Sequence, residues 1–205
     1  KKQLTKAVDT GNLDLVHAVA SEINTINERE FKMIESIAKL SNIRDPEVDM
    51  HDKWEFVNFT VKGNSHYTGL GFFDEKGMGY ATSGKYSDLH DREYLAVSMQ
   101  GKRALQDPDF SPVTGKFCSY YAVPVYDFNN RQIAEISCVV DATELCKTVS
   151  EIGVGKNSHP FIVSMKTGKD VAHQNEKLPK DGVLATDNAS KGLKSALAKA
   201  LSGAT

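Results

Sequence analysis

The stretch KFCSYYAVPVYDFNNRQIAEISCVVD, residues 116 to 141, predicts two neighbouring β-strands. Both halves are rich in the β-branched and aromatic residues that favour strands. The polar segment DFNN between them, residues 127 to 130, has the composition of a turn. We therefore expect two strands, at 116–127 and 131–141, joined by this turn.

The segment before this pair of strands predicts further β-structure. YTGLGFFDEKGMGYATSG, residues 67 to 84, contains two short strand-like runs around the turn Glu75-Lys76-Gly77, where glycine can supply a positive φ. The next stretch, YSDLHDREYLAVSMQGK at 86 to 102, has an apolar helical spacing. It predicts a helix that starts near Asp91 and ends at Gly101.

The first forty residues predict one long helix of about 60 Å. Apolar residues alternate at spacings of four and three, with Glu30 standing where another would fall, at Val19, Ile23, Ile26, Met33, Ile37 and Leu40. Such a repeat is typical of a coiled-coil-like seam. The seam could serve a second copy of the chain, but we expect it to pack mostly on its own modules, leaving at most a weak homodimer. Pro46 then breaks the helix, and a second helical pattern runs through Trp54.

The C-terminal third predicts a second, smaller module. Residues 142–152 and 189–203 have helical patterns, and the segment between them repeats an earlier one. In this echo, VSMKTGKDVAHQ at 163 to 174 follows FFDEKGMGYATS at 72 to 83, and Gly168 falls where Gly77 fell. Two similar modules on one stalk helix would explain the echo, with the second module incomplete.

The overall composition excludes several classes of protein. The chain has 205 residues, 40% of them hydrophobic, and a net charge of −2, so it offers no basic surface for nucleic acid or anionic lipid. No run of 18 apolar residues is present. Both ends of the chain are interpreted as cut edges of a longer protein. Cys118 and Cys138 could form a disulfide, although buried free thiols are the interpretation we favour.

The sequence contains none of the common enzyme signatures, such as a nucleophile elbow, a P-loop or a zinc-binding HExxH. We therefore predict no catalytic residues, no metal site and no cofactor. A hydrolase that uses Cys118 or Ser119 with a nearby histidine stays open as an alternative, because the sequence cannot place such groups together.

The cluster DREY, residues 91 to 94, is the candidate binding site. Arg92 offers a bidentate fork for a carboxylate, and Tyr94 offers a flat apolar wall with a hydroxyl tip. Asp107 and Asp141 end the strand-like runs that follow, and either could receive an ammonium group. The structural alternative is that Asp91 caps the helix and Arg92 is solvated.

The order of these elements resembles the double Cache family, tandem PAS-like sensor domains that lie outside the bacterial cell membrane. The resemblance covers most of the chain: the first helix, the segments GLGFFDEKGMGYATSGKYSDLHDREYLAVSMQGK and VTGKFCSYYAVPVYD, and then ISCVVDATEL and FIVSMKTGKDVAHQN. It implies an α+β fold with a long N-terminal helix and two PAS-like antiparallel-sheet modules. It also implies flanking transmembrane helices and a methyl-accepting, histidine kinase or diguanylate cyclase output domain.

The resemblance also implies roles for individual residues. Amino-acid-binding members carry an Arg, a Trp two residues later with a Tyr beside it, and a distal Asp for the ammonium. Arg92 and Asp141 match the Arg and the distal Asp, whereas Tyr94 stands at the Trp position and Leu95 replaces the Tyr. Near the position of another binding Tyr, this chain has Asp109 and Phe110. The pattern is partial, so an amino acid, a carboxylate, an amine or a purine-like ligand all stay open.

These observations lead to one expected organisation. Residues 1–48 form the stalk helix and its break, residues 49–150 the membrane-distal ligand-binding module, and residues 151–205 the incomplete membrane-proximal module. The expected function is that of a non-enzymatic, extracytoplasmic small-molecule sensor. In this reading the ligand contacts Arg92, Tyr94, Asp107, Phe110 and Asp141. A PAS-like module that only dimerises, with a closed pocket, is the second alternative.

Overall fold

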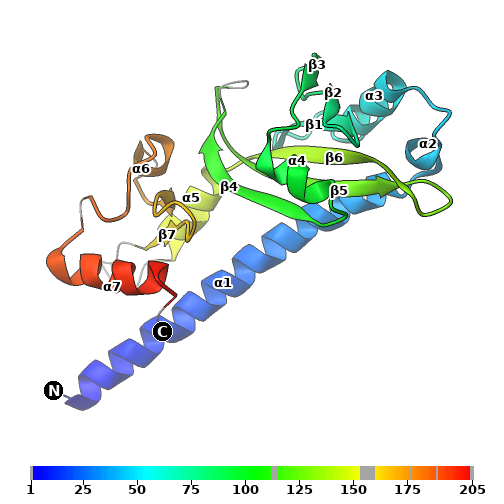
Figure 1. Ribbon diagram of the computed structural model, residues 1–205. Coiled ribbons are helices and arrows are strands. Elements are labelled where there is room, and N and C mark those ends of the chain that lie inside the picture. Colours follow the sequence, from blue (N-terminus) through cyan, green and yellow to red (C-terminus); the bar gives the residue numbers. More distant parts are fainter. Residues whose placement is uncertain (1, 112–114, 153–159, 176, 188, 204–205) are drawn as a thin grey trace. The chain divides into compact units, whose positions relative to one another are not determined.

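The computed structural model describes residues 2–111, 115–152, 160–175, 177–187 and 189–203, with side chains from Asp14 onward (Figure 1). The chain divides into two compact units. The sheet unit is Thr25–Asp141, and the terminal unit is Lys1–Asn24 together with Ala142–Thr205. The longest helix, α1 (Lys2–Ala38), contributes residues to both units.

The sheet unit is built on a six-stranded antiparallel sheet with the order β3-β2-β1-β6-β5-β4. The first strand therefore pairs with the last. The strands are β1 (Tyr67–Asp74), β2 (Met78–Tyr80), β3 (Tyr86–Asp88), β4 (Ala104–Phe110), β5 (Phe117–Tyr126) and β6 (Gln132–Asp141). With α1 and a second antiparallel pair in the terminal unit, this sheet confirms the predicted α+β fold class.

The predicted pair of strands is β5 and β6, which pair along almost their whole length. Asp127 holds the turn between them, because its carboxylate accepts hydrogen bonds from the N–H groups of Asn129 and Arg131, each at 2.9 Å. Asn130 adopts a left-handed backbone conformation with φ 61°, which asparagine tolerates better than most residues. The turn residues named from composition are thus the ones that close the turn.

One face of the sheet packs against three helices: α1, α2 (Ser41–Arg44) and α3 (Met50–Thr60). Alternate residues of the two longest strands face this layer, as the period of two in a strand requires: Tyr121, Val123, Val125, Ala134, Ile136, Cys138 and Val140. The helices contribute Phe31, Ile34, Ile37, Ile43 and Val57. This layer is the main hydrophobic core of the unit.

Polar contacts fasten α3 to the neighbouring strand β1. The side-chain amide of Asn58 donates to the carbonyl of Leu70 at 2.8 Å, and its oxygen accepts the N–H of Leu70 at 3.0 Å. The indole of Trp54 donates to the same carbonyl at 3.1 Å. The helix predicted after Pro46 is therefore confirmed, and two of its side chains satisfy backbone groups of a strand.

The opposite face of the sheet carries the short helix α4 (Glu93–Ser98). Its core is small and is formed by Phe73, Tyr94, Leu95, Ala104 and Ala122. Six residues of helix span only about 9 Å, so α4 cannot cover the whole face.

The boundaries of α4 differ from those expected. Arg92, not Asp91, occupies the N-cap position, and it makes no side-chain cap hydrogen bond. The helix ends at Ser98, and Gly101 follows with φ 76°. The interpretation of Asp91 as the helix cap is therefore wrong, which leaves the role of Arg92 to be explained.

The buried stripe on α1 includes Glu30, the position at which the apolar repeat of the sequence is interrupted. Glu30 is fully buried and lies 3.1 Å from the Nε2 atom of His66, while the guanidinium of Arg29 donates to it. Ile34 is also fully buried, whereas Leu40 lies beyond the helix and is exposed. A buried carboxylate that has hydrogen-bond donors can replace an apolar residue in such a stripe.

Arg103 links the start of β4 to α1. Its guanidinium donates to Glu35 at 2.6 and 2.9 Å and to Glu28 at 2.9 and 3.0 Å.

We expect Arg103→Ala to lower the free energy of unfolding by about 1 kcal/mol, because these ion pairs are partly exposed. Urea unfolding in low salt and in about 1 M salt measures the change, which should shrink at high salt. Arg103→Lys is the matched control, since it keeps the charge without the two-sided fork. An equal loss at both salt concentrations would instead indicate packing of the side chain on Phe31.

The terminal unit contains one antiparallel strand pair and helices. In it, α5 (Thr143–Glu151) packs against β8 (Asp170–His173), which pairs with β7 (Phe161–Val163). The other helices are α6 (Lys177–Lys180) and α7 (Lys191–Leu201). The two predicted helices of this region are thus confirmed as α5 and α7.

The internal echo corresponds to two similar structural units. Gly77 between β1 and β2 has φ 78°, and Gly168 between β7 and β8 has φ 71°. Each glycine therefore turns the chain in a conformation that residues with a Cβ rarely adopt. The expected module boundaries after residues 48 and 150 stay a prediction.

Candidate functional site

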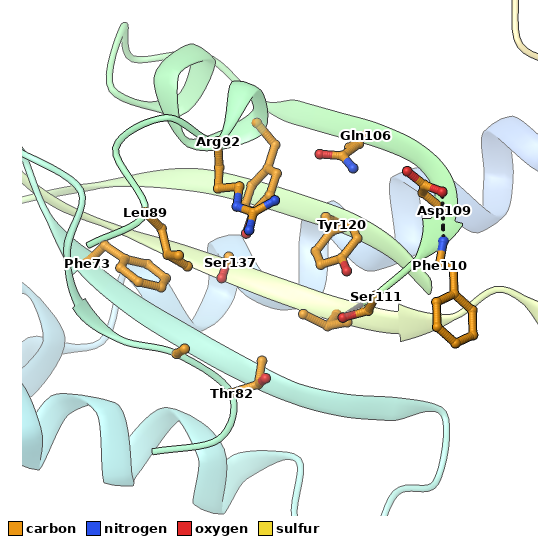
Figure 2. Close-up of a pocket in the computed structure, with 13 residues that line it drawn as sticks. Phe73, Thr82, Leu89, Arg92, Gln106, Asp109, Phe110, Ser111, Tyr120 and Ser137 are labelled. Atoms are coloured by element: carbon orange, nitrogen blue, oxygen red, sulfur yellow. Dashed lines mark hydrogen bonds between the residues drawn. The ribbon is translucent and has the colours of Figure 1, made fainter. Parts of the chain in front are cut away.

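A cavity of about 110 Å³ lies on the α4 side of the sheet (Figure 2). It is large enough for a small metabolite, since a single water needs only about 10–15 Å³ by the same measure. All of its described lining residues belong to the sheet unit: Phe73, Ala81, Thr82, Leu89, Arg92, Tyr94, Gln106, Asp109, Phe110, Ser111, Tyr120, Ser137 and Val139. They come from β1, β4 and the residue after it, β5, β6, α4 and the segments that precede α4.

The alternation of side chains along a strand explains which residues line the back of the cavity. Tyr120 of β5 and Ser137 and Val139 of β6 line it, while their neighbours Tyr121 and Cys138 belong to the core on the other face. Successive side chains of a strand point to opposite faces of the sheet. The residues that build the main core thus determine which residues face the cavity.

A glycine makes room for two side chains at the back of the cavity. A Cβ atom at Gly71 of β1 would lie 2.5 Å from the ring of Phe73 and 2.7 Å from the Oγ atom of Ser137. Both of these neighbours line the cavity. The glycine in YTGLGFF therefore lets these two side chains approach the strand closely.

Two tyrosines form an aromatic wall. The rings of Tyr94 on α4 and Tyr120 on β5 are stacked, with centroids 5.2 Å apart and an interplanar angle of 17°. Burial raises the pKa of both phenols, so both remain neutral at physiological pH. The pair can offer a flat apolar surface together with hydroxyl groups.

Arg92 supplies the positive charge of the site. Figure 2 shows its guanidinium directed into the cavity. The side chain is 45% exposed, and its Nε atom lies 4.0 Å from a carboxylate oxygen of Asp91. This contact is too long for a hydrogen bond, so the guanidinium can bind an added carboxylate.

Asp109 and Phe110 lie at the end of β4 beside the cavity (Figure 2). The carboxylate of Asp109 accepts the N–H of Phe110 at 2.8 Å, and the phenyl ring of Phe110 is 53% exposed. A carboxylate on the same cavity as Arg92 gives the site both signs of charge. An exposed aromatic ring is suited to cover a ligand.

A buried carboxyl lies behind the cavity, on the same face of β6 as Ser137. Glu135 is fully buried, and in the described part of the chain neither of its oxygens has a well-formed hydrogen bond. Burial raises its pKa to about 8, although the nearby hydroxyl of Ser98 on α4 acts to lower the pKa. At neutral pH this carboxyl is therefore mostly protonated.

The structure brings together three of the five predicted site residues. Arg92, Tyr94 and Phe110 line the cavity. Asp107 is exposed on β4, and Asp141 ends β6, and neither is among the described residues that line the cavity. An irregularity in the pairing of β4 between residues 106 and 109 breaks the alternation there.

Sequence reasoning missed other lining residues, above all Tyr120 and Ser137. A signal for both was present, because each alternates with a core residue along a predicted strand. Gln106 and Asp109 flank the irregular part of β4, which the sequence pattern does not mark. Asp109 is named in the sequence only as the neighbour of Phe110, and it is not among the five predicted site residues.

The cysteines do not form the disulfide considered above. Cys118, Cys138 and Cys146 are buried, and none of the three is in a disulfide. Cys118 is paired across the sheet with Asp141, and Cys138 with Tyr121, so the first two thiols are not opposite each other. The preferred interpretation of buried thiols is confirmed. The sulfur of Cys118 lies 3.9 Å from the hydroxyl of Thr68.

Among the described residues, one group could offer ligand atoms to a metal ion. His51, Asp52 and Glu55 of α3 have candidate atoms within 4.8 Å of one another. Both acidic residues are exposed, and exposed acidic groups commonly gather without an ion. The group lies outside the cavity and supports no argument about it.

Comparison with known proteins identifies relatives in structure only. No protein-family model matches the sequence, and no curated protein matches it. An extracellular ligand-binding receptor from Desulfohalobium retbaense superposes with a TM-score of 0.71 at 14% identity, over 92% of this chain and 34% of that one. This chain thus spans about a third of that receptor.

Two chemoreceptor ligand-binding domains are also similar. The domain of CtaA from Pseudomonas fluorescens, in complex with L-isoleucine, has a TM-score of 0.59 and 16% identity over 82% of this chain and 68% of its own. The domain of Tlp3 from Campylobacter jejuni, in complex with L-valine, has a TM-score of 0.62 and 12% identity over 86% and 73%. These likenesses show that the chain shares the α+β fold of these ligand-binding domains.

The search for membrane-spanning helices gives one further finding. In the described residues, every helix is too short or too polar to cross a bilayer.

Proposed function

We propose that the chain is the extracytoplasmic sensor domain of a transmembrane signalling receptor. It binds a small polar molecule in the cavity between α4 and the sheet and performs no catalysis. The observation that carries the proposal is the convergence of an arginine and two stacked tyrosines on a cavity, within a fold shared with the ligand-binding domains of chemoreceptors.

The lining suits a ligand with a carboxylate. Arg92 would hold that group, and Tyr94 and Tyr120 would contact the body of the ligand. An ammonium on the same ligand would pair with the carboxylate of Asp109, which lines the cavity. Asp141 stays a proposed contact, because it follows Val139 by two positions along β6 and so falls on the same face. Asp107, exposed on β4, stays a weaker proposed contact.

A thermal-shift screen of the purified chain against amino acids, other carboxylates and amines tests this function. We expect at least one compound to raise the melting temperature, since a ligand at 100 times its Kd adds about 2.7 kcal/mol of stability. Carboxylates should predominate among the hits. Specific turnover of a compound would contradict the non-enzymatic assignment.

The absence of any shift across the screen would favour the alternative of a structural dimerisation module. Sedimentation of the isolated chain separates the two functions further. We expect a monomer or a weak homodimer, because much of the buried stripe of α1 packs on the sheet of its own chain. A tight dimer at low micromolar concentration would count against this expectation.

A further inference from the structure

A second cavity, of about 480 Å³, lies wholly within the terminal unit. It is bordered by β7, β8, α6 and the segment that leads into α7. Apolar side chains make up much of its wall, namely Phe161, Leu178, Val183, Leu184 and Leu193. The cavity shares no residue with the site in the sheet unit.

One acidic side chain lines this apolar cavity. Asp170, the first residue of β8, is only 6% exposed. Its Oδ1 atom is shielded from solvent and has no hydrogen-bond donor among the residues that the structure describes. A buried polar atom without a partner destabilises the folded chain, and a buried charge does so more strongly. A carboxyl group in this state is rare unless something else satisfies it.

The surroundings of Asp170 indicate which chemistry would satisfy it. His173 lines the same cavity, and its Nδ1 atom accepts the N–H of Asn175 at 2.8 Å. Because Nδ1 accepts this bond, Nε2 is the ring atom that can donate. The ring of Phe161 lies beside that of His173, with centroids 6.2 Å apart. An aromatic ring and a carboxylate that line the same cavity together favour a cation.

We propose that this second cavity binds a small organic cation, an aliphatic ammonium, whose charged group pairs with Asp170. The ammonium donates to Oδ1, and the alkyl part of the ligand packs on the leucine and valine side chains. An anionic ligand would be repelled by the carboxylate. The inference stands apart from the function proposed for the sheet unit, because the two cavities have no residue in common.

Calorimetry on the full chain with n-butylammonium tests the proposal, with n-butanol as a neutral compound of the same shape. We expect n-butylammonium to bind and n-butanol to bind at least about tenfold more weakly. Asp170→Asn should weaken n-butylammonium binding by about tenfold or more, whereas Asp181→Asn, which changes an exposed aspartate outside the described lining, should leave it unchanged. Equal binding of the alcohol and the amine would overturn the proposal, as would unchanged amine binding by Asp170→Asn.

A second variant keeps the test decisive if Asp170→Asn fails to fold. Ala189 lines the cavity and is only partly buried, so Ala189→Phe should fill the cavity without disturbing the core. We expect this variant to keep the circular dichroism spectrum of the wild type and to lose n-butylammonium binding. Retained binding in a folded Ala189→Phe variant would place the amine elsewhere and overturn the proposal.

Discussion

Replacing Arg92 with alanine should weaken the binding of a carboxylate ligand by roughly thirtyfold or more, equivalent to about 2–5 kcal/mol. The reason is that a ligand would cover the guanidinium, which is 45% exposed in the empty cavity, and form a desolvated, charge-assisted pair with it. The variant should fold normally, with a change in stability of no more than about 0.5 kcal/mol, because the contact of Arg92 with Asp91 is long. Calorimetry with the strongest carboxylate from the thermal-shift screen measures the loss.

Two companion variants make this result specific. Arg131→Ala removes an arginine that is 72% exposed and paired with Asp127 outside the cavity, so it should leave affinity unchanged. Asp141→Ala should weaken a ligand that carries an ammonium and matter little for a plain carboxylate. If both Arg92→Ala and Asp141→Ala bind as well as the wild type, the ligand binds elsewhere.

The stability of the protein should fall as the pH rises from about 5 to 8, and Glu135→Gln should remove most of that fall. The pKa of Glu135 is about 8 in the folded protein, against an ordinary value of 4.5, because burial disfavours its charged form. Below the ordinary value both states hold the proton, and stability is fully present. Between the two values the unfolded chain releases its proton while the folded chain keeps it, so stability is lost progressively as the pH rises through the folded pKa.

The size of this effect follows from the difference between the two pKa values. One pKa unit corresponds to about 1.4 kcal/mol, so we expect a loss on the order of 2–4 kcal/mol between about pH 5 and pH 8. Urea unfolding of the wild type and Glu135→Gln across this range measures it. Glu75→Gln, which changes an exposed glutamate in the turn after β1, should keep the wild-type slope. An unchanged slope in Glu135→Gln would show that Glu135 is ionised in the folded protein.

The candidate site was only partly accessible to sequence reasoning. Arg92 and Tyr94 could be found because a charged and an aromatic residue stand together where a helical pattern begins. Asp107 was selected because it stands at the end of a strand-like run, but the pairing of β4 is irregular there and the residue is exposed. The cavity instead receives Asp109, whose position depends on that irregularity.

Local patterns in the sequence were sufficient to predict most of the individual strands and helices. The pattern around DFNN predicted β5 and β6, the glycine turn at Gly77 predicted β1 and β2, and the apolar repeat predicted α1. Period, turn chemistry and apolar spacing act between residues close in the chain, so they can be read without knowledge of the neighbours in space. The sequence pattern does not predict the short strand β3, because three residues are too few to show a period.

Only the tertiary structure decided how these elements combine. The pairing of β1 with β6 joins residues 60 to 73 positions apart in the chain, from Asp74 with Ala134 to Tyr67 with Val140. It leaves one sheet face to α1, α2 and α3 and the other to α4 and the cavity. The same arrangement buries Glu30 beside His66 and Glu135 on the α4 face of the sheet. Within the terminal unit, packing separately buries Asp170 at the second cavity. Desolvation and long-range strand pairing depend on residues that are distant in the chain, and a local pattern contains no information about which of them will be neighbours.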